Sequence, residues 1–486
     1  MGSSAPQHVD LAGIARRAML EAGFDPDFAP DVLAQAAAPV APSPPEQRDL
    51  RDLLWSSIDN PTSRDLDQIE FVKREGNDEM RISIGIADVD AFVPKGSPAD
   101  QRAAQNGFSI YLGVATFPML PPQLSNDRSS LVPDQDRPAV VFEIVLHADD
   151  TIDAALISSA DVRNHAKLDY ESVGAWMEQT GNAPPRVIAT AGLAEQLQLQ
   201  REATERLHTE RLRAGALEFE SIEPHPVMTG QNIATLELQR KNRARDLIED
   251  LMIAANRSIA KFLEEKGWSS LQRIVRTPER WPRIVELAAL HGGRLPDTAD
   301  AVELAKFLKS QRQKDPARFP DLSLAIIKLI GPAEYVVVRD ANDNEGHFGL
   351  AVHDYTHSTA PNRRYPDLVV QRLLKAAVGN QPSPYSVEDL EQIAARSNER
   401  AAAARKIERL MRKVAAATFL GNRVGQTFEG IVTGASIKGT YVRISKPPAE
   451  GRVVRGEAGL DVGDKVRVKL IGTVPEKGFI DFARNG

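Results

Sequence analysis

Apolar residues recur with a helical period near the start of the chain. They occupy positions 11, 14, 15, 18, 19 and 22, the spacing of one buried helix face. Gly23 is a natural stop, and a second short helix is expected to begin near Pro30. The run APVAPSPPEQ that follows is typical of a Pro-rich linker. The two helices fit either a helix-turn-helix RNA clamp or an adapter that packs on another domain.

The pattern then changes to strands and afterwards to helices. MRISIGIADV and AVVFEIVLHA, both between residues 51 and 160, are short segments rich in β-branched residues and predict strands. Residues 190–310 follow a helical pattern, with the clearest helix, LIEDLMIAANRSIAKFLEEKG, ending at Gly267. Residues 385–420 predict another long helix. Because no second linker interrupts residues 51–420, we expect one α/β domain there.

The last 60 residues differ from the rest of the chain. FEGIVTGASIKGTYVRIS, GLDVGDKVRVKLIGTV and GFIDFA are short strands separated by glycine turns, which predicts a small all-β barrel. The expected organisation is therefore a helical segment with its linker at 1–47, a mixed α/β domain at 48–424 and a barrel at 425–486.

Composition narrows the class of protein. Hydrophobic residues make up 42% and charged residues 26% of 486, ordinary values for a globular enzyme. The chain has no cysteine, which excludes a disulfide scaffold, a zinc-thiolate site and a cysteine nucleophile. No apolar run is long enough to span a bilayer, and MGSSAPQHVD is not a signal peptide. We expect a cytoplasmic monomer without a membrane partner.

The formal net charge of −7 is unusual for a nucleic-acid binder, but the charge is unevenly distributed. Residues 427–486 hold ten Lys and Arg against seven Asp and Glu, and residues 396–423 hold eight against two. A local basic stripe can bind phosphate on an acidic protein. A solvated helix face is the alternative interpretation of residues 396–423.

Three carboxylates gather in SIDNPTSRDLDQ. Asp65 and Asp67 are two residues apart, so in an extended strand both side chains point the same way. The turn sequence NPTS can fold Asp59 back toward them. Clustered carboxylates suit Mg²⁺ or Mn²⁺, which can activate water and neutralise charge at a phosphoryl group. Three surface aspartates around a turn are the alternative.

A second group of candidate residues lies far along the chain, in HFGLAVHDYTHSTAPNRRYPDL. Arg363 and Arg364 follow a proline turn there, and a guanidinium is well matched to phosphate. Tyr111, Tyr170 and Phe219 lie near glycine, proline or charged residues, where a ring can stack on a base. Ordinary salt bridges and core packing are the alternatives for these residues.

Together these segments resemble the ribonuclease II family. The family's first motif, roughly T-I-D-x-x-x-x-x-D-x-D-D, is matched by SIDNPTSRDLDQ. The likeness continues through IGIADVDAFVPKGS, FPMLPPQLSNDRSSLVPDQDRPAV, LIEDLMIAAN and the arginine segment, in order over residues 51–380. FEGIVTGASIKGTYVRI resembles the S1-type OB fold, the family's C-terminal RNA-binding module. The likeness is nearest to a bacterial ribonuclease II whose cold-shock barrels are replaced by a helical leader.

The resemblance assigns the metal and catalytic positions. Asp59, Asp65 and Asp67 match the first three acidic positions of the metal site, and Gln68 stands at the fourth. Asp65, Asp67 and Arg363 are the implied catalytic residues, with Arg363 matching the arginine that stabilises the scissile phosphate. An amide at position 68 can bind a metal ion but brings no charge, which puts a second metal ion in doubt.

The resemblance also assigns RNA contacts. Tyr170 and Glu249 match residues that sense the ribose of the terminal nucleotides, and Tyr111 and Phe219 match an aromatic clamp around the terminal bases. Arg364 is expected to contact the RNA as well. The arginine motif reads TAPNRRYPD where TSPIRRYPD is usual.

The implied activity is processive, magnesium-dependent hydrolysis of single-stranded RNA from a free 3′ end, releasing nucleoside 5′-monophosphates. The rival from another class is a catalytically impaired RNA-binding protein of the same fold, for which Gln68 is the motivating residue. A DNA exonuclease is a further rival.

Overall fold

Two short helices lie at the N-terminal side of the described chain. The computed structural model describes residues 9–39, 47–220, 224–230, 232–238, 241–340, 343, 345–436 and 439–485. The helices are α1 (Leu11–Glu21) and α2 (Pro30–Ala37), as the apolar spacing predicts. The Asp10 carboxylate caps α1 by accepting the Gly13 N–H at 2.8 Å. Residues 40–46 of the expected Pro-rich linker lie outside the described residues.

A mixed sheet forms the centre of the larger domain. Within the described residues it has six strands in the order β1-β8-β2-β3-β4-β7, and β8 also pairs with β7. The strands are β1 (Arg48–Asp49), β2 (Trp55–Asp59), β3 (Gln68–Arg74), β4 (Met80–Ala87), β7 (Asp136–Leu146) and β8 (Ile152–Asp169). Strand β8 runs parallel to β2, so their carboxyl ends lie together, with Asp59 opposite Asp169.

Helices pack on this sheet and bury its apolar side chains. Helix α6 contacts β3 and β4, α7 contacts β7 and β8, and α11 contacts β8. Gln196 of α6 exchanges two hydrogen bonds, of 2.7 and 2.9 Å, with the backbone of Val72. The helices of this domain are α3 (Pro98–Asn106), α4 (Tyr170–Met177), α5 (Pro185–Ala189), α6 (Leu193–Ala214), α7 (Arg243–Glu265), α8 (Trp281–Leu290), α9 (Ala301–Lys314), α10 (Phe319–Ile330) and α11 (Tyr365–Val378).

The expected helical region at 190–310 also contains strands, so that prediction was wrong in part. Strands β9 (Pro224–Thr229) and β10 (Asn232–Leu238) form a hairpin, and β11 (Ser270–Ile274) pairs with β12 (Glu334–Val338). The five residues of β11 are all buried, and their partner strand begins 60 residues later. Such a short strand depends on a distant partner and leaves little local signal.

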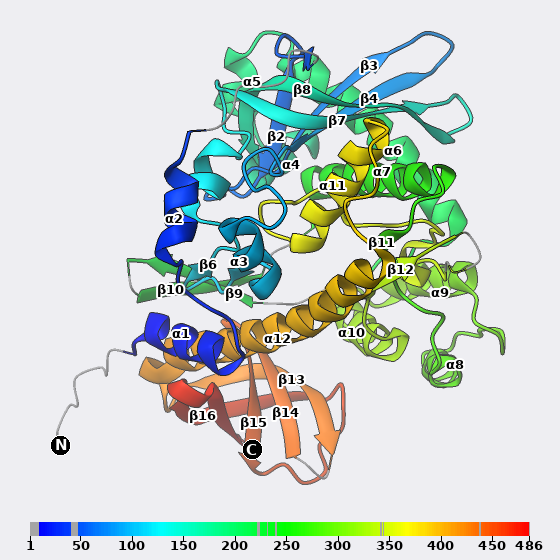
Figure 1. Ribbon diagram of the computed structural model, residues 1–486. Coiled ribbons are helices and arrows are strands. Elements are labelled where there is room, and N and C mark those ends of the chain that lie inside the picture. The colour runs from blue at the N-terminus through cyan, green and yellow to red at the C-terminus, as the bar shows by residue number, and fades with distance from the viewer. Residues whose placement is uncertain are drawn as a thin grey trace.

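Helix α12 (Val387–Leu420) joins the larger domain to the barrel, and it matches the long helix expected at 385–420. Ser386 and Asp389 form a capping box at its start. As Figure 1 shows, α12 crosses between the domain above and the barrel below. Ala416, Ala417 and Leu420 of α12 belong to the barrel's core.

The C-terminal strands close into a barrel, confirming the predicted OB-type fold. The order is β13-β14-β15-β17-β16. The strands are β13 (Thr427–Ser436), β14 (Gly439–Ser445), β15 (Pro448–Arg455), β16 (Lys465–Val474) and β17 (Phe479–Arg484). Phe428, Val442 and Phe482 are among its buried side chains. The fold class is therefore a mixed α/β catalytic-type domain with an OB barrel, as the sequence predicts.

The N-terminal helices pack on other elements, in agreement with the adapter interpretation. Met19 and its apolar neighbours on α1 share a cluster with Ile407 and Met411 of α12. The same cluster includes Ile110 and Leu112, which belong to or follow strand β5 (Ile110–Tyr111). Strand β5 pairs with β6 (Thr116–Phe117). Helix α1 thus supports this hairpin from behind.

The basic stripe at 396–423 is partly structural. The Arg400 guanidinium donates to the Gly23 carbonyl at 2.9 Å, and Arg396 donates to the Ala104 carbonyl at 3.2 Å. Arg405, Lys406, Arg409 and Lys413 are exposed. Among the described residues, no helix combines the length and apolar character that crossing a membrane requires.

Candidate active site

Asp67 lies immediately before β3 at the centre of the candidate site, and only 1% of it is exposed. Its carboxylate accepts the Asn362 N–H at 2.9 Å and the Arg363 Nε–H at 3.2 Å. Burial raises the pKa of the Asp67 carboxyl to about 7, although the charge of Arg363 opposes the shift. The structure therefore brings together two candidate residues that are 296 positions apart.

Arg363 is the cationic member of this pair. Burial alone would lower the pKa of its guanidinium, but Asp67 and the other acidic groups nearby together outweigh burial, and the pKa is raised. The charges of Asp59 and Asp65 also raise the pKa of Arg363, so all three predicted carboxylates favour its charged form. The side chain of Arg363 remains 44% exposed, which leaves part of the guanidinium open to a phosphate.

The segment carrying Arg363 is held from both sides. The Asn362 side chain accepts the Ser129 hydroxyl at 2.6 Å, and the Ala360 N–H donates to Asp367 at 2.8 Å. Arg364 pairs with the fully buried Asp367 at 2.6 Å. The structure thus gives Arg364 an internal ion pair, and its predicted RNA contact stays a prediction.

Asp59 and Asp65 lie at the two ends of the turn predicted from NPTS. The Asp59 carboxylate accepts the Asn60 N–H at 2.6 Å and the Ser63 hydroxyl at 2.9 Å. Lys167 donates to the carbonyls of Pro61 and Ser63, at 3.1 and 2.5 Å. This lysine comes from the neighbouring strand β8, and nothing in its local sequence distinguishes it.

Tyr111 lies at the end of β5 and faces the site. Its hydroxyl donates a hydrogen bond to the Asp65 carboxylate, a contact that the sequence analysis did not predict. The residue is 43% exposed, so its ring is available for stacking on a base. The flanking residues Ile110 and Leu112 are buried in the α1 cluster. The apolar support from α1 therefore fixes where this ring points.

Substitutions at Tyr111 should distinguish the contribution of its ring from that of its hydroxyl. Base–aromatic stacking contributes roughly 1–3 kcal/mol per base, so Tyr111→Ala is expected to change the length of the final undigested oligonucleotide more than the rate. Tyr111→Phe keeps the ring and serves as the matched control, with the parental end product expected. Denaturing gels of end-labelled RNA measure both. If Tyr111→Ala leaves the parental end product, the tyrosine acts only as a support for Asp65.

Tyr170 and Glu249 lie on the neighbouring helices α4 and α7. Tyr170 is the first residue of α4, and the Arg245 guanidinium stacks over its ring at 4.3 Å from the centroid. Glu249 pairs with Lys241 at 3.0 Å and Arg211 at 3.8 Å. Asp169, the residue before Tyr170, pairs with Asp59 in the sheet, which brings α4 close to the Asp59 turn. The ribose-sensing roles of Tyr170 and Glu249 stay predictions.

Phe219 occupies different surroundings. It packs against the cluster formed by α8, α9 and α10, which includes Trp281 and Phe319. Within the described residues, no ring contact joins Phe219 to Tyr111. The structure does not pair the two rings of the expected clamp, and the role of Phe219 stays a prediction.

His208 belongs to an ion-pair cluster with Asp250, the residue after Glu249. Hydrogen bonds to Asp250 and Glu218, with closest approaches of 3.2 and 3.5 Å, raise the pKa of His208 to about 9. Since the pKa of an unfolded histidine is about 6.5, this pairing stabilises the fold fully below pH ~6.5. The stabilisation is lost as the pH rises through about 9.

We therefore expect His208→Gln to remove part of the pH dependence of stability. A shift of this size corresponds to at most about 3 kcal/mol, and solvent screening reduces it because 33% of the side chain is exposed. The free energy of unfolding in urea is measured at pH 6.5 and pH 9 for parent and variant. An equal pH 6.5-to-9 difference in both proteins would contradict the assignment.

The donor chemistry of the site fits a hard divalent cation. Asp59, Asp65 and Asp67 supply carboxylate oxygens, and Gln68, only 6% exposed, supplies an amide oxygen. Glu70 is completely buried, and neither of its carboxylate oxygens has a hydrogen-bond partner in the described part of the chain. Within the described residues, however, no group of three or more Asp, Glu or His side chains lies close enough together to hold a metal ion. Glu70, which follows Gln68 by two positions, was not among the residues predicted from the sequence.

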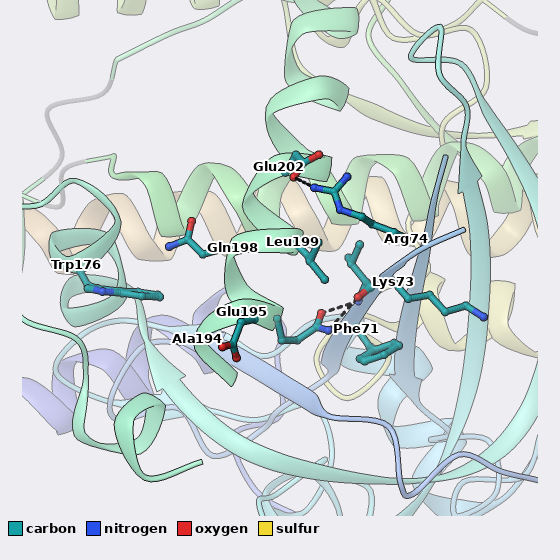
Figure 2. A pocket seen from close by; sticks show the side chains of 11 residues that line it. Phe71, Lys73, Arg74, Trp176, Ala194, Glu195, Gln198, Leu199 and Glu202 are labelled. Atoms are coloured by element: carbon teal, nitrogen blue, oxygen red, sulfur yellow. Dashed lines mark hydrogen bonds and ion pairs between the residues drawn. The ribbon is translucent and has the colours of Figure 1, made fainter. Parts of the chain in front are cut away.

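A surface groove of about 780 Å³ lies elsewhere, between β3 and α6. It is lined by Phe71, Leu199 and their neighbours, and Figure 2 shows Arg74 of β3 reaching Glu202 of α6 at its edge. None of the predicted site residues lines this groove. It is separate from the candidate active site.

Residues 47–380 match the family model of the RNB domain. The chain belongs to the RNB-domain family. Residues 426–485 match the RNase II-type exonuclease C-terminal S1 domain, which agrees with the closed barrel. The RNB match covers the strands and loops that carry Asp59, Asp67 and Arg363. The predicted resemblance to the ribonuclease II family is thereby confirmed.

Relatives of this RNB-domain chain are named ribonuclease R. Ribonuclease R 1 of Lactococcus lactis subsp. lactis is 29% identical over 432 residues, covering 86% of this chain and 52% of the relative. Ribonuclease R of Escherichia coli is 29% identical over 451 residues, covering 87% of this chain and 54% of the relative. The chain thus spans about half the length of these two relatives.

Solved structures share the RNB fold. Mycoplasma genitalium RNase R in complex with ribose methylated single-stranded RNA has a TM-score of 0.87 at 22% identity, covering 98% of this chain and 78% of that one. Yeast Ssd1, a pseudonuclease, has a TM-score of 0.70 at 18% identity, covering 94% and 56%. The fold is therefore common to a nuclease and a pseudonuclease, and only the site residues can separate the two.

Proposed function

We propose that this RNB-domain chain is an exoribonuclease that hydrolyses single-stranded RNA from its 3′ end and releases nucleoside 5′-monophosphates. The observation that carries the proposal is the ion pair between the buried Asp67 and the partly exposed Arg363, whose guanidinium is also stabilised by the charges of Asp59 and Asp65. A phosphodiester bound by this guanidinium would also lie beside the Asp67 carboxylate. The names of the relatives, and the RNA in the Mycoplasma genitalium complex, agree with the substrate class.

Each side chain has a role that follows from its position. Arg363 binds the scissile phosphate and balances the negative charge that develops there. Asp67, which the Asn362 N–H anchors, holds that guanidinium in place, while Tyr111 stacks on a terminal base beside Asp65. A bound Mg²⁺, or Mn²⁺ in its place, would lower the pKa of the attacking water and neutralise phosphoryl charge. The carboxylates of Asp59, Asp65 and Asp67 would hold it.

A catalytically impaired RNA-binding protein is the second candidate, favoured by the uncharged Gln68 and by the likeness to yeast Ssd1. The retained Asp67–Arg363 pair argues against it, because a protein that only binds RNA does not need a buried carboxylate with a raised pKa at its centre. The two candidates differ in whether the bound RNA is shortened, which can be measured.

One assay separates the candidates. RNA and DNA with single-stranded 3′ tails, labelled uniformly along the strand or, in parallel, at the 5′ end, are incubated with the protein in Mg²⁺ and in EDTA and resolved on a sequencing gel. A ladder of shortening RNA, dependent on Mg²⁺ and accompanied by mononucleotides, is expected. RNA that is bound in a filter assay but never shortened would support the impaired protein, and shortened DNA would support a DNA exonuclease.

A further inference from the structure

Glu70 is a carboxylate in a place where a strand normally holds an apolar side chain. It lies within β3, has no exposed surface, and has no hydrogen-bond partner for either oxygen among the described residues. Burying a carboxylate without a partner is unfavourable. Such a group in a native site therefore calls for a positively charged ligand or a role in the chemistry.

The surroundings of Glu70 place it beside the candidate metal site. It is two residues after Gln68 on the same strand, so both side chains lie on one face of β3. Its backbone pairs with Ser56, three positions before Asp59 on the adjacent strand β2. Strand β2 continues from Ser56 to Asp59, whose backbone pairs with Asp169, the residue before Tyr170. Glu70, Asp59 and Tyr170 therefore lie on adjoining segments of the sheet.

We propose that Glu70 supplies the metal site with the carboxylate that is missing at Gln68. This inference rests on the proposed metal-dependent nuclease function. The negative charge has moved two positions along β3, one repeat of the strand, so it stays on the same face. A cation bound among Asp59, Gln68 and Glu70 would pair with the two unpartnered oxygens and remove the cost of burying them.

Manganese binding without RNA tests the proposal directly. Mn²⁺ is titrated at fixed ionic strength and followed by electron paramagnetic resonance, with Mg²⁺ as competitor, in the parent chain, Glu70→Gln, Gln68→Asp and the double variant. Glu143→Gln is the matched control, because Glu143 lies on β7 of the same sheet and pairs with Arg48 and Arg81. Hydrolysis of RNA by the parent is measured in parallel.

The expected result is a compensation pattern. Glu70→Gln should weaken Mn²⁺ binding by about 10-fold or more, and Glu143→Gln should leave it unchanged. Gln68→Asp should restore affinity in the Glu70→Gln background and change it much less in the parent, since the two positions contribute the same charge. The midpoint of thermal unfolding in EDTA should not fall in Glu70→Gln, because the variant loses a buried, unpartnered carboxylate.

Two results would overturn the proposal in distinguishable ways. If the parent binds Mn²⁺ and hydrolyses RNA while Glu70→Gln binds Mn²⁺ equally well, Glu70 is only a buried neutral acid and the proposed function stands. If the parent neither binds Mn²⁺ nor hydrolyses RNA, the metal-dependent function fails as well. If Glu70→Gln does not fold, Gln68→Asp in the parent is compared with a variant that carries an added carboxylate elsewhere. An equal gain in Mn²⁺ affinity from the two changes would also refute the proposal.

Discussion

Asp67→Asn is expected to abolish RNA hydrolysis while leaving the fold at least as stable as the parent. The amide oxygen can still accept the Asn362 N–H, so the loop keeps its anchor, but the charge that pairs with Arg363 is gone. Loss of one preorganised charged group of this kind typically costs about 10²–10³-fold in rate, and we expect the upper end because Asp67 is also a candidate metal ligand.

The stability part of this prediction follows from the pKa of Asp67. Its value of about 7 in the folded chain exceeds the value of about 3.9 in an unfolded chain, so ionisation of Asp67 destabilises the fold as the pH rises between these values. Removing the charge should therefore leave the unfolding midpoint at pH 8 in EDTA unchanged or higher.

Single-turnover rates, RNA affinity and thermal unfolding measure the three parts of the prediction. Asp52→Asn is the matched control, because Asp52 is an exposed aspartate in the turn before β2. Turnover of Asp67→Asn within tenfold of the parent would mean that Asp67 lies outside the catalytic site. A large loss of RNA affinity together with a lower unfolding midpoint would mean that the residue is structural.

Arg363→Lys is expected to lower the rate by about 10²-fold, although the positive charge is kept. A guanidinium can donate one N–H to Asp67 and others to a phosphate, whereas an ammonium group is a single compact donor. With 44% of its side chain exposed, Arg363 has room for both partners. The loss should therefore appear in kcat, while the Kd for RNA changes by less than about threefold, since many other phosphate contacts set affinity.

Arg163→Lys controls for the substitution itself, because Arg163 is a half-exposed arginine paired with Asp136 on the sheet. Steady-state kinetics on a short single-stranded RNA give kcat and KM for both variants. If Arg363→Lys keeps more than a third of the parental kcat, charge alone is sufficient at this position, and the forked geometry of arginine has no catalytic role.

Much of the architecture could be predicted from local patterns. The apolar spacing of α1 and the capping box and length of α12 are signals carried within one segment, and both helices form where expected. The glycine-punctuated strands after residue 425 likewise close into the barrel. By contrast, β11 is five residues long and depends on β12, and β9 and β10 interrupt a region with a helical pattern. Their formation depends on tertiary partners that no local period reveals.

The candidate site was predictable as a set of residues but not as an arrangement. The residue types and the family resemblance indicate Asp59, Asp67 and Arg363, yet only the folded chain shows that Asp67 bonds the Arg363 segment. The Tyr111–Asp65 hydrogen bond joins a base-stacking residue to a candidate ligand, and sequence spacing contains no sign of it. Glu70 could have been suspected, because an acidic residue on the inward face of a buried strand breaks the expected alternation.

Helix α12 belongs to three hydrophobic clusters in succession: Leu390 and Ala394 to the main core, Ile407 and Met411 to the α1 cluster, and Ala417 and Leu420 to the barrel. A helix of 34 residues at ~1.5 Å per residue is about 50 Å long. It is anchored along its whole length, so the spacing between the barrel and the Tyr111 hairpin is fixed. If RNA binds both the barrel and the active site as proposed, α12 acts as a molecular ruler: the shortest strand that can engage both sites is set by this rigid spacing rather than by a tether that can stretch.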